Sequence, residues 1–450
     1  MNESKRRDFL KTAVVAGLSL AAAPAIGGSV LGANDRIRVA VIGLRGRGRE
    51  LINSFHQLAG ENVEIVALCD VDQAVLEERT AAYEKLSGKK VQTLGDMRKV
   101  LDDKSIDAVG FATPNHWHAL GTVWACQAGK DVYVEKPGSH SIFEGRKVVE
   151  AAAKYKRIVQ HGTQNRSSPN IVEGIQKLKE GVIGRVYLAR GIAFKGPRAA
   201  LGRIDGDPAP PGLDWDRWLG PAPSTPYSKV RHRSWHQIWE YGNGDIGNQG
   251  VHELDIMRWA LDLDTHPTKV VSMGGKYIAK DDTDAPQVHA TMFEYAGRDL
   301  MVQFETRSGL TNTEAGMGAE YPFLDKRNVV GVIFIGTGGF MILPDYSSYY
   351  TFLGPKRTPG PKAVGAGDIS NLPHFANFIK AMRSRKPEDA TAGPKELHYS
   401  AALPHLANIA CRTGRMLQFD PKAERFTGDE EANKLLRRQY RAPYIVPDKV

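Results

Sequence analysis

The sequence predicts an α/β protein with two domains: a doubly wound parallel sheet, then an α+β domain built on a large, mostly antiparallel open sheet. Two observations carry this prediction. Short β-branched runs alternate with helical stretches from residue 36 to about residue 159, the order typical of a parallel sheet with helices on both faces. Beyond Asp255, strand-like runs follow one another directly. We place the domains at 34–159 and 160–450, after an N-terminal segment of 33 residues.

The composition is that of a soluble globular protein, with 42% hydrophobic and 25% charged residues among 450. The net charge is +9, without a long Lys/Arg run or an aromatic RNA-reading motif, so we expect no nucleic-acid partner. No metal-ligand spacing stands out, and we expect no metal. The three cysteines, Cys69, Cys126 and Cys411, are too few for a disulfide framework, and we expect buried, reduced thiols.

The N-terminal segment is typical of an export signal. Residues 4–11 read Ser-Lys-Arg-Arg-Asp-Phe-Leu-Lys, an apolar stretch covers 13–22, and small residues follow at 21–25. This resembles a bacterial twin-arginine signal peptide, and the apolar stretch is too short for a comfortable transmembrane span. We therefore expect the twin-arginine translocation machinery to export the folded protein to the periplasm or another extracytoplasmic compartment.

The first elements of the parallel sheet form a dinucleotide-binding unit. A strand over 36–42 runs into a loop with Gly43, Gly46 and Gly48, a helix follows, and a second strand over 63–69 ends at Asp70. Glycines allow close backbone approach, and the helix N-terminus offers N–H groups and a positive dipole end to a pyrophosphate. The carboxylate lies where a ribose hydroxyl is bound. The pattern predicts a Rossmann domain.

The charges beside this loop bear on the choice of cofactor. Asp70 and Asp72 would repel a 2′-phosphate, which favours NAD. Arg45, which stands where the usual pattern has glycine, and Arg47 could compensate, so NADP stays open as the alternative.

Polar residues follow the next strands of the sheet. A strand over 106–112 ends in Thr-Pro-Asn-His-Trp-His at 113–118, ahead of a helix over 119–128. Another over 131–134 ends in Glu135, Lys136 and Pro137. Ligands of such sheets bind beyond the carboxyl ends of the strands, so we expect these side chains to lie near the glycine loop.

Residues 242–255, Gly-Asn-Gly-Asp-Ile-Gly-Asn-Gln-Gly-Val-His-Glu-Leu-Asp, are the main candidate for chemistry in the second domain. Four glycines predict a tight loop, and the apolar pattern predicts a helix from Val251. Asn248, His252 and Asp255 are spaced by four and three, which places them on one helical face. Histidine is suited to proton transfer near neutral pH; the alternative is a capped surface helix with a chance histidine.

Together, the glycine loop with Asp70, the Thr-Pro-Asn-x-x-His and Glu-Lys-Pro strand ends and the Gly-x-His-x-x-Asp segment resemble the Gfo/Idh/MocA oxidoreductases, over nearly the whole chain after the signal. The resemblance implies a cofactor site lined by Gly43, Arg45, Gly46, Arg47, Gly48, Asp70, Thr113, Pro114, Asn115, His118, Glu135, Lys136 and Gln164. It implies catalytic roles for Lys136, His252 and Asn248, and substrate contacts from Arg166, Asp255 and His252; for Arg166, a surface ion pair is the alternative. It also implies a cis bond between Lys136 and Pro137. Trp235 of the covering loop (residues 196–245) is a further candidate for substrate contact.

One position departs from the family pattern. The residue four before His252 is usually aspartate and is Asn248 here. An amide cannot take a proton, which puts a proton relay through this position in doubt.

The rest of the second domain gives a covering loop and a sheet. Residues 196–245 are rich in Pro, Gly, Trp and Arg and predict an ordered loop over the substrate cleft. Its Trp215, Trp218, Trp235 and Trp239 could stack on a sugar ring or pack the loop itself. Strands are predicted at 269–278, 288–295, 299–306, 330–335 and 340–343, and helices at 171–180, 372–383 and 396–417. The resemblance implies that the outer face of the sheet forms a homodimer or homotetramer.

The resemblance implies an NAD-dependent enzyme that transfers a hydride from a sugar, polyol or glycoside carbon, with His252 removing the hydroxyl proton and a charged Lys136 stabilising the oxyanion. Two alternatives remain: an NAD-dependent glycosidase or lyase acting by transient oxidation and elimination, and a cofactor-binding sensor without turnover. Because export through the twin-arginine route would carry the cofactor along, we expect NAD to be held tightly.

Overall fold

The structure is a computed structural model that describes residues 35–196, 199–309, 329–366 and 371–450. The chain divides into one unit up to Arg36 and a second from Ile37 to Val450, and the fold described below is that of the second unit. The predicted export signal lies outside the described residues. In the described part of the chain no helix has the length and apolar character needed to span a membrane.

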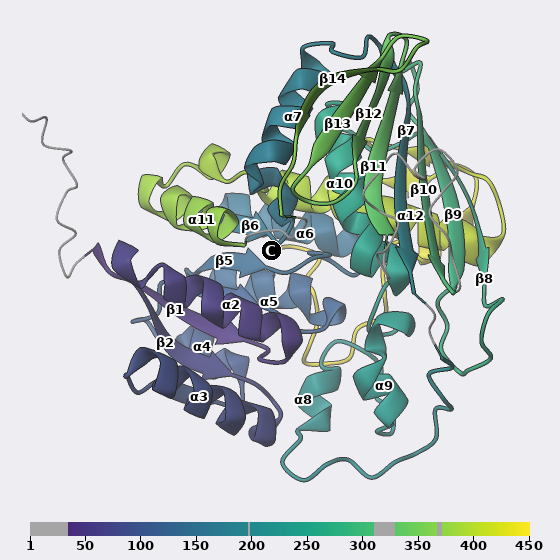
Figure 1. Cartoon of the computed structure of the whole chain (residues 1–450). Helices are drawn as coiled ribbons and strands as arrows, with labels where there is room; N and C mark the ends of the chain where they lie inside the picture. The colour runs from purple at the N-terminus through teal and green to yellow at the C-terminus, as the bar shows by residue number, and fades with distance from the viewer. Residues whose placement is uncertain (1–34, 197–198, 310–328, 367–370) are drawn as a thin grey trace, which may run out of the picture. The chain divides into compact units, whose positions relative to one another are not determined.

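The first sheet has six parallel strands in the order β3-β2-β1-β4-β5-β6 (Figure 1). They are β1 (Ile37–Ile42), β2 (Val63–Cys69), β3 (Gln92–Leu94), β4 (Ala108–Phe111), β5 (Asp131–Val134) and β6 (Val159–His161). The helices between them are α2 (Gly46–Gln57), α3 (Gln73–Ser87), α4 (Met97–Asp102), α5 (Asn115–Gln127) and α6 (Ile142–Tyr155). The predicted Rossmann sheet is confirmed.

The second sheet has ten strands in the order β14-β13-β12-β11-β7-β10-β9-β8-β15-β16. They are β7 (Val186–Lys195), β8 (Lys269–Gly275), β9 (Val288–Glu294), β10 (Met301–Ser308), β11 (Val329–Gly336), β12 (Gly339–Leu343), β13 (Tyr349–Leu353), β14 (Thr358–Ala363), β15 (Leu417–Asp420) and β16 (Arg425–Phe426). The pair β7–β10 is parallel, and the other recorded pairs are antiparallel. The predicted mostly antiparallel sheet is confirmed, and the sequence missed β7 and β13–β16.

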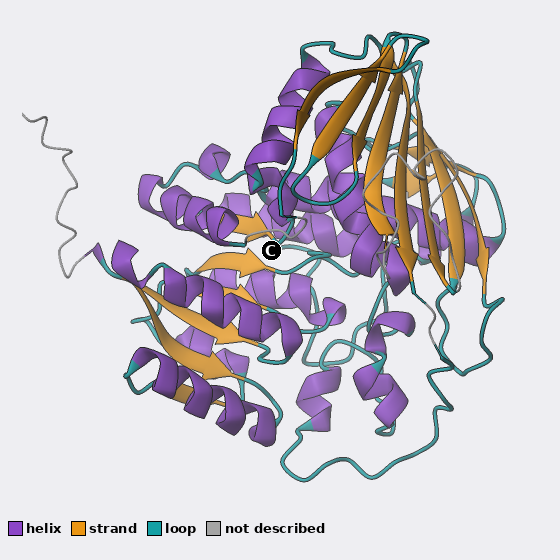
Figure 2. Ribbon diagram, viewed as in Figure 1, coloured by secondary structure: helices purple, strands orange, loops and turns teal. Residues whose placement is uncertain are grey.

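Helices join the two sheets (Figure 2). The buried apolar residues of α10 (Val251–Ala260) and α12 (Pro394–Thr413) pack with the inner face of the ten-stranded sheet. Helix α11 (Leu372–Ser384) belongs to the core of the other sheet, where Phe375 stacks on Tyr133 with ring centroids 4.3 Å apart. A late segment of the chain therefore completes the nucleotide-binding domain. The remaining helices are α7 (Pro169–Lys179), α8 (Trp215–Leu219), α9 (Lys229–Arg233) and α13 (Glu430–Lys434).

Two local predictions are wrong. Helix α5 begins at Asn115, not Ala119, so Asn115 and His118 lie in its first turn. The glycine-rich segment is not a tight loop: Ile246–Gly250 forms a π-helical turn, η5, that continues into α10. A Cβ on Gly250 would lie 2.5 Å from the Phe304 ring, so this glycine serves close packing of helix on sheet. The predicted cis bond between Lys136 and Pro137 is confirmed.

Candidate active site

A pocket of about 280 Å³ lies beyond the carboxyl ends of the parallel strands. Its walls come from three places: the glycine loop after β1, the ends of β2, β4 and β5, and the loop around α8 and η4 (Trp235–Gln237). The predicted cofactor residues on its walls are Gly43, Arg45, Gly46, Arg47, Asp70, Thr113, Pro114, Asn115, His118, Glu135 and Lys136. Residues up to about ninety positions apart in the sequence thus lie together at one edge of the sheet, as expected for a doubly wound fold.

Each of the three glycines of the loop is needed for a different structural reason. Gly43 has φ +84°, and a Cβ there would lie 2.8 Å from the backbone of Ala112. A Cβ on Gly48 would lie 1.9 Å from the carbonyl oxygen of Gly43, so this glycine allows the helix to approach the strand. Gly46 lines the pocket, and a Cβ there meets nothing within 4 Å. It is the first residue of α2, where no side chain caps the helix. This open helix N-terminus fits a pyrophosphate.

Asp70 is held in place at the end of β2. Its Oδ2 accepts the Leu44 N–H (2.8 Å) and its Oδ1 accepts the Asp72 N–H (3.0 Å). Burial raises the pKa of Asp70, against the hydrogen bonds from these two amides. A carboxylate fixed this way presents its remaining lone pairs to a ribose hydroxyl, as the cofactor fit requires.

Both arginines of the glycine loop are paired with acids. Arg45 pairs with Asp72, and Arg47 Nε donates to Glu135 Oε1 (2.7 Å). Arg47 also donates to Asn371 Oδ1 at the start of α11 (3.2 Å). An arginine held by a carboxylate is less available to a 2′-phosphate, and these pairs favour NAD.

Lys136 is the pocket's candidate for proton transfer. Its Nζ donates to the backbone oxygen (2.7 Å) and to the Oδ1 (3.1 Å) of Asn248, so the π turn of one domain orients the lysine of the other. Burial, with Arg47 and Lys195 nearby, lowers the pKa of Lys136 to about 8, although Glu135 opposes the shift. An amine with this pKa is partly unprotonated at neutral pH and can accept a proton.

His252 lies behind this lysine on the first turn of α10. It is 9% exposed, does not line the pocket, and its Nδ1 is buried without a hydrogen-bond partner among the described residues. Its ring packs beside that of Tyr346, with centroids 5.6 Å apart. Burial, reinforced by Lys136 and Arg47, holds the pKa of His252 well below its usual value, so the imidazole is neutral at physiological pH.

Gln164 lies behind Glu135 and not on the pocket wall. Its Nε2 donates to the Tyr133 hydroxyl (2.9 Å) and to Glu135 Oε1 (3.2 Å). Gln164 therefore positions the glutamate that also holds Arg47. The sequence grouped it correctly with this site, but its contacts are with protein.

The predicted substrate contacts of Arg166 and Asp255 do not fit the geometry. Arg166 donates three hydrogen bonds of 2.9–3.0 Å to the Asp255 carboxylate, and Ser400 Oγ donates a fourth. Asp255 is fully buried, and neither residue lines the pocket. Because the carboxylate and guanidinium satisfy each other, the pair is a structural connection between α10 and η3 (Gln164–Ser167).

The tryptophans of the covering loop divide between two roles. Trp215 stacks on Trp218 at 4.5 Å, and both belong to the loop's own core. Trp235 stacks on His236, with ring centroids 3.5 Å apart, and both line the pocket. Trp239 lies beneath Arg412 and outside this pocket. Only Trp218 and Trp235 of the four therefore reach the pocket wall.

Sequence reasoning missed three polar wall residues: Arg217, His232 and His236. They lie in the stretch predicted to cover the cleft, but no motif marks them there. Burial lowers the pKa of His236 to about 3, so it contributes a neutral imidazole beside Trp235.

Comparison with family models identifies both halves of this arrangement. The model described as "Oxidoreductase family, NAD-binding Rossmann fold" matches residues 37–163. The model described as "Oxidoreductase family, C-terminal alpha/beta domain" matches residues 178–303 and 368–446.

The chain belongs to the Gfo/Idh/MocA oxidoreductase family.

Its first domain is thus an NAD-binding Rossmann domain. Among solved structures, the chain as a whole is similar to a levoglucosan dehydrogenase in complex with NADH and L-sorbose. The TM-score is 0.65 and the identity 16%, and the match covers 85% of this chain and 98% of that one. It is also similar to the WlbA dehydrogenase of Bordetella pertussis in complex with NADH and UDP-GlcNAcA, with TM-score 0.62, 17% identity, and coverage of 86% and 99%. At these identities the likeness establishes the fold.

Curated relatives match more locally. "Glycosyl hydrolase family 109 protein 1" of Shewanella sp. (strain ANA-3) is 32% identical over 179 residues, 35% of this chain and 39% of the relative. A "Glycosyl hydrolase family 109 protein" of Solibacter usitatus (strain Ellin6076) is 33% identical over 171 residues, 35% and 38% respectively. The matched part spans about two fifths of these relatives.

Proposed function

We propose that this NAD-binding oxidoreductase acts on a hydroxyl-bearing carbon of a sugar, polyol or glycoside. Bound NAD would supply the hydride acceptor. The observation that carries the proposal is Lys136, an amine of lowered pKa on the wall of the dinucleotide pocket, oriented by Asn248. The geometry favours Lys136 as the group that accepts the hydroxyl proton, with His252 as a neutral imidazole behind it.

The cofactor's contacts follow from the pocket. The open N-terminus of α2 at Gly46 would hold the pyrophosphate, Asp70 the adenosine ribose, and Glu135 with His118 the region near the nicotinamide. The stacked rings of Trp235 and His236 line the same pocket and would limit water around a bound substrate. A dry site strengthens the charge interactions made during the reaction.

A second candidate is an NAD-dependent glycosidase or lyase, in which oxidation is transient and elimination follows. It is favoured by the family 109 glycosyl hydrolase relatives, which are 32–34% identical over the matched part. Lys136 would hold the same proton in either case, so the wall of the pocket fits both reactions.

Product analysis separates the candidates. The purified protein is incubated with a panel of glycosides and free sugars without added NAD. Accumulation of oxidised sugar supports the oxidoreductase, and cleaved glycoside without net NADH supports the glycosidase. Lys136→Met should abolish either product while retaining NAD. If neither product forms across the panel, the protein is a cofactor-binding sensor and the proposal is wrong.

We also propose that the protein is exported folded by the twin-arginine route with its cofactor loaded. Residues 4–25 support this proposal by their pattern. The expected outcome is that mature protein carries NAD(H) through gel filtration, measured as dinucleotide released on denaturation. Less than about a tenth of a mole per mole, with micromolar or weaker rebinding, would refute the cofactor argument. Export itself is tested by replacing Arg6 and Arg7 with lysine and fractionating the cells.

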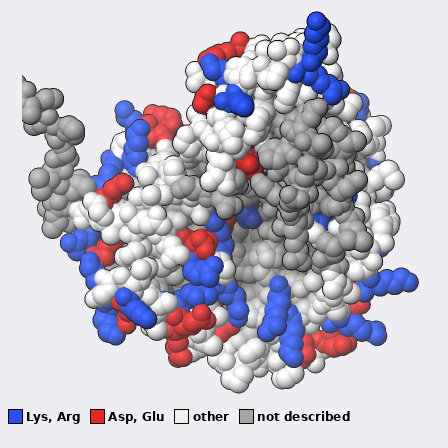
Figure 3. Space-filling view, in the orientation of Figure 1, with Lys and Arg blue, Asp and Glu red and all other residues white. Residues whose placement is uncertain are grey.

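We also propose that the protein forms a homo-oligomer through the outer face of the ten-stranded sheet. Val271, Met273, Met292 and Met301 are exposed on three adjacent strands of this face, Met273 to 77%, and apolar patches of this kind support an interface. On the face shown in Figure 3, by contrast, acidic and basic side chains are interspersed. Met273→Lys should shift the protein toward monomer in light scattering; an unchanged mass would refute this interface.

A further inference from the structure

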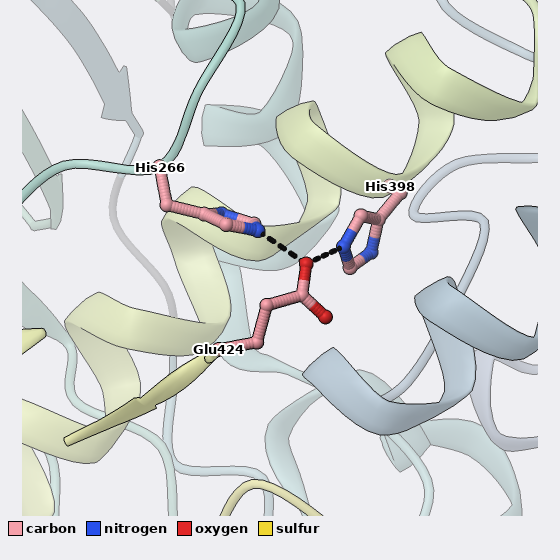
Figure 4. Close-up of side chains that lie close together, drawn as sticks. All are labelled: His266, His398 and Glu424. Atoms are coloured by element: carbon pink, nitrogen blue, oxygen red, sulfur yellow. Dashed lines mark hydrogen bonds and ion pairs between the residues drawn. The ribbon is translucent and has the colours of Figure 1, made fainter. Parts of the chain in front are cut away.

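Three side chains outside the pocket converge on one point beneath the ten-stranded sheet (Figure 4). His266 comes from the loop before β8, His398 from α12 and Glu424 from the β15–β16 turn. Both Nε2 atoms lie against Glu424 Oε1, at 2.8 Å for His266 and 2.6 Å for His398. The three ligand atoms all lie within 4.8 Å of one another. We propose that this cluster is a structural site for a divalent transition metal such as Zn²⁺.

The ligand set matches the chemistry of such ions. Two imidazoles and one carboxylate suit Zn²⁺ and its neighbours, with a water as the fourth ligand. Both imidazole side chains are only 1% exposed and the Glu424 side chain is 14% exposed, so an ion held between them would be shielded from bulk water.

The backbone conformation of Glu424 also supports a specific role for this residue. Its φ is +51°, a left-handed conformation that costs a non-glycine residue energy and persists where the surroundings require it. The conformation turns the glutamate toward the histidines (Figure 4). His266 also borders a surface pocket whose lining includes Thr265, Asp420 and Lys422.

Arg146 is the cation beside this site. Its Nε donates to Glu424 Oε2 (3.2 Å) and its Nη2 binds Oε1. With the metal bound, Oε1 would turn to the ion while Oε2 keeps the arginine, the outer hydrogen bond that ligating carboxylates commonly have. Each histidine would then carry its proton on Nδ1. Nδ1 of His398 is buried without a hydrogen-bond partner among the described residues, so its N–H in the metal-bound tautomer would need a water as acceptor.

The test uses the full-length protein, dialysed against a chelator and titrated with Zn²⁺ by calorimetry, with Co²⁺ absorption as a second probe. We expect one equivalent per chain and a rise in melting temperature. His398→Gln keeps an N–H donor for Glu424 and so should fold, but should weaken binding by about tenfold or more. His56→Gln, a partly exposed histidine on α2, is the control and should bind as the parent does.

The variant Arg146→Gln distinguishes a metal site from a cluster that is held together by hydrogen bonds alone. Because Arg146 is the outer hydrogen-bond partner of the ligating carboxylate, its loss should weaken Zn²⁺ binding by about tenfold, while a cluster without a metal would only lose an ion pair. The proposal is overturned if the parent binds no Zn²⁺, or if His398→Gln binds it with the parent's affinity and stoichiometry. Circular dichroism of each variant ensures that a loss of binding is not a loss of fold.

Discussion

Replacing Asn248 by aspartate should raise the pKa of Lys136. The Asn248 Oδ1 lies 3.1 Å from Nζ and is a neutral acceptor, whereas a carboxylate there would stabilise the ammonium form. With an effective dielectric constant of about 20–80, Coulomb's law at 3.1 Å gives about 1.3–5.4 kcal/mol. At about 1.4 kcal/mol per pKa unit, the pKa rises by at least about one unit from its present value of about 8.

The direction of the pKa shift of Lys136 determines how activity changes with pH. Lys136 is an ammonium below its pKa, so a higher pKa reduces the unprotonated amine at neutral pH. At pH 7 its fraction falls from about one in ten to about one in a hundred or less. Any reaction that needs this amine as a proton acceptor loses about tenfold or more at pH 7 and recovers as the pH rises toward 10.

The pKa can be measured without knowing the substrate. The protein is labelled with an amine-acylating reagent across a pH series, and the peptide with Lys136 is quantified by mass spectrometry. The parent should reach half-maximal labelling near pH 8 and Asn248→Asp at least about one unit higher. Asn248→Ala, which removes the acceptor without adding charge, is the control and should stay near the parent. Equal midpoints in the parent and Asn248→Asp would refute the reasoning.

Three further changes test the remaining parts of the site. Gly46→Val should fold normally, because a Cβ there meets nothing within 4 Å, but should bind NAD about tenfold more weakly or worse, because it adds a branched side chain at the glycine position where the backbone approaches the pyrophosphate. Gly43→Ala should instead lose about 1–3 kcal/mol of stability at φ +84°. Calorimetry of NAD binding and urea unfolding distinguish the two variants, and equal effects of both would contradict these separate roles. Asp255→Asn should lower the free energy of unfolding by about 3–5 kcal/mol, because Arg166 keeps a buried charge without its counterion. A decrease below about 1 kcal/mol would contradict the structural role of this ion pair. Asp70→Ala should weaken NAD binding and narrow the gap to NADP in parallel titrations; unchanged NAD affinity would show that Asp70 does not bind the ribose.

The sequence by itself determined the two-sheet architecture and the residues that the parallel strands and the glycine loop bring to the pocket. Strands such as Val63–Cys69 and Asp131–Val134 were predictable to the residue because buried parallel strands are short apolar runs with sharp ends. Glycine spacing and an acid at a strand end are local features that the dinucleotide requires, and a reader of the chain can see them directly. Edge strands such as β14, with two prolines among its six residues, carry no such pattern.

Only the tertiary structure decided what each polar residue touches. Asp255 and Arg166 have the spacing and chemistry of substrate ligands, yet they neutralise each other, because both become buried where α10 crosses η3. The lowered pKa of Lys136 depends on burial by loops far away in the chain, and Gly250 before His252 serves a close contact with Phe304 of β10. Such outcomes depend on distances between segments, which the order of residues along one chain does not contain.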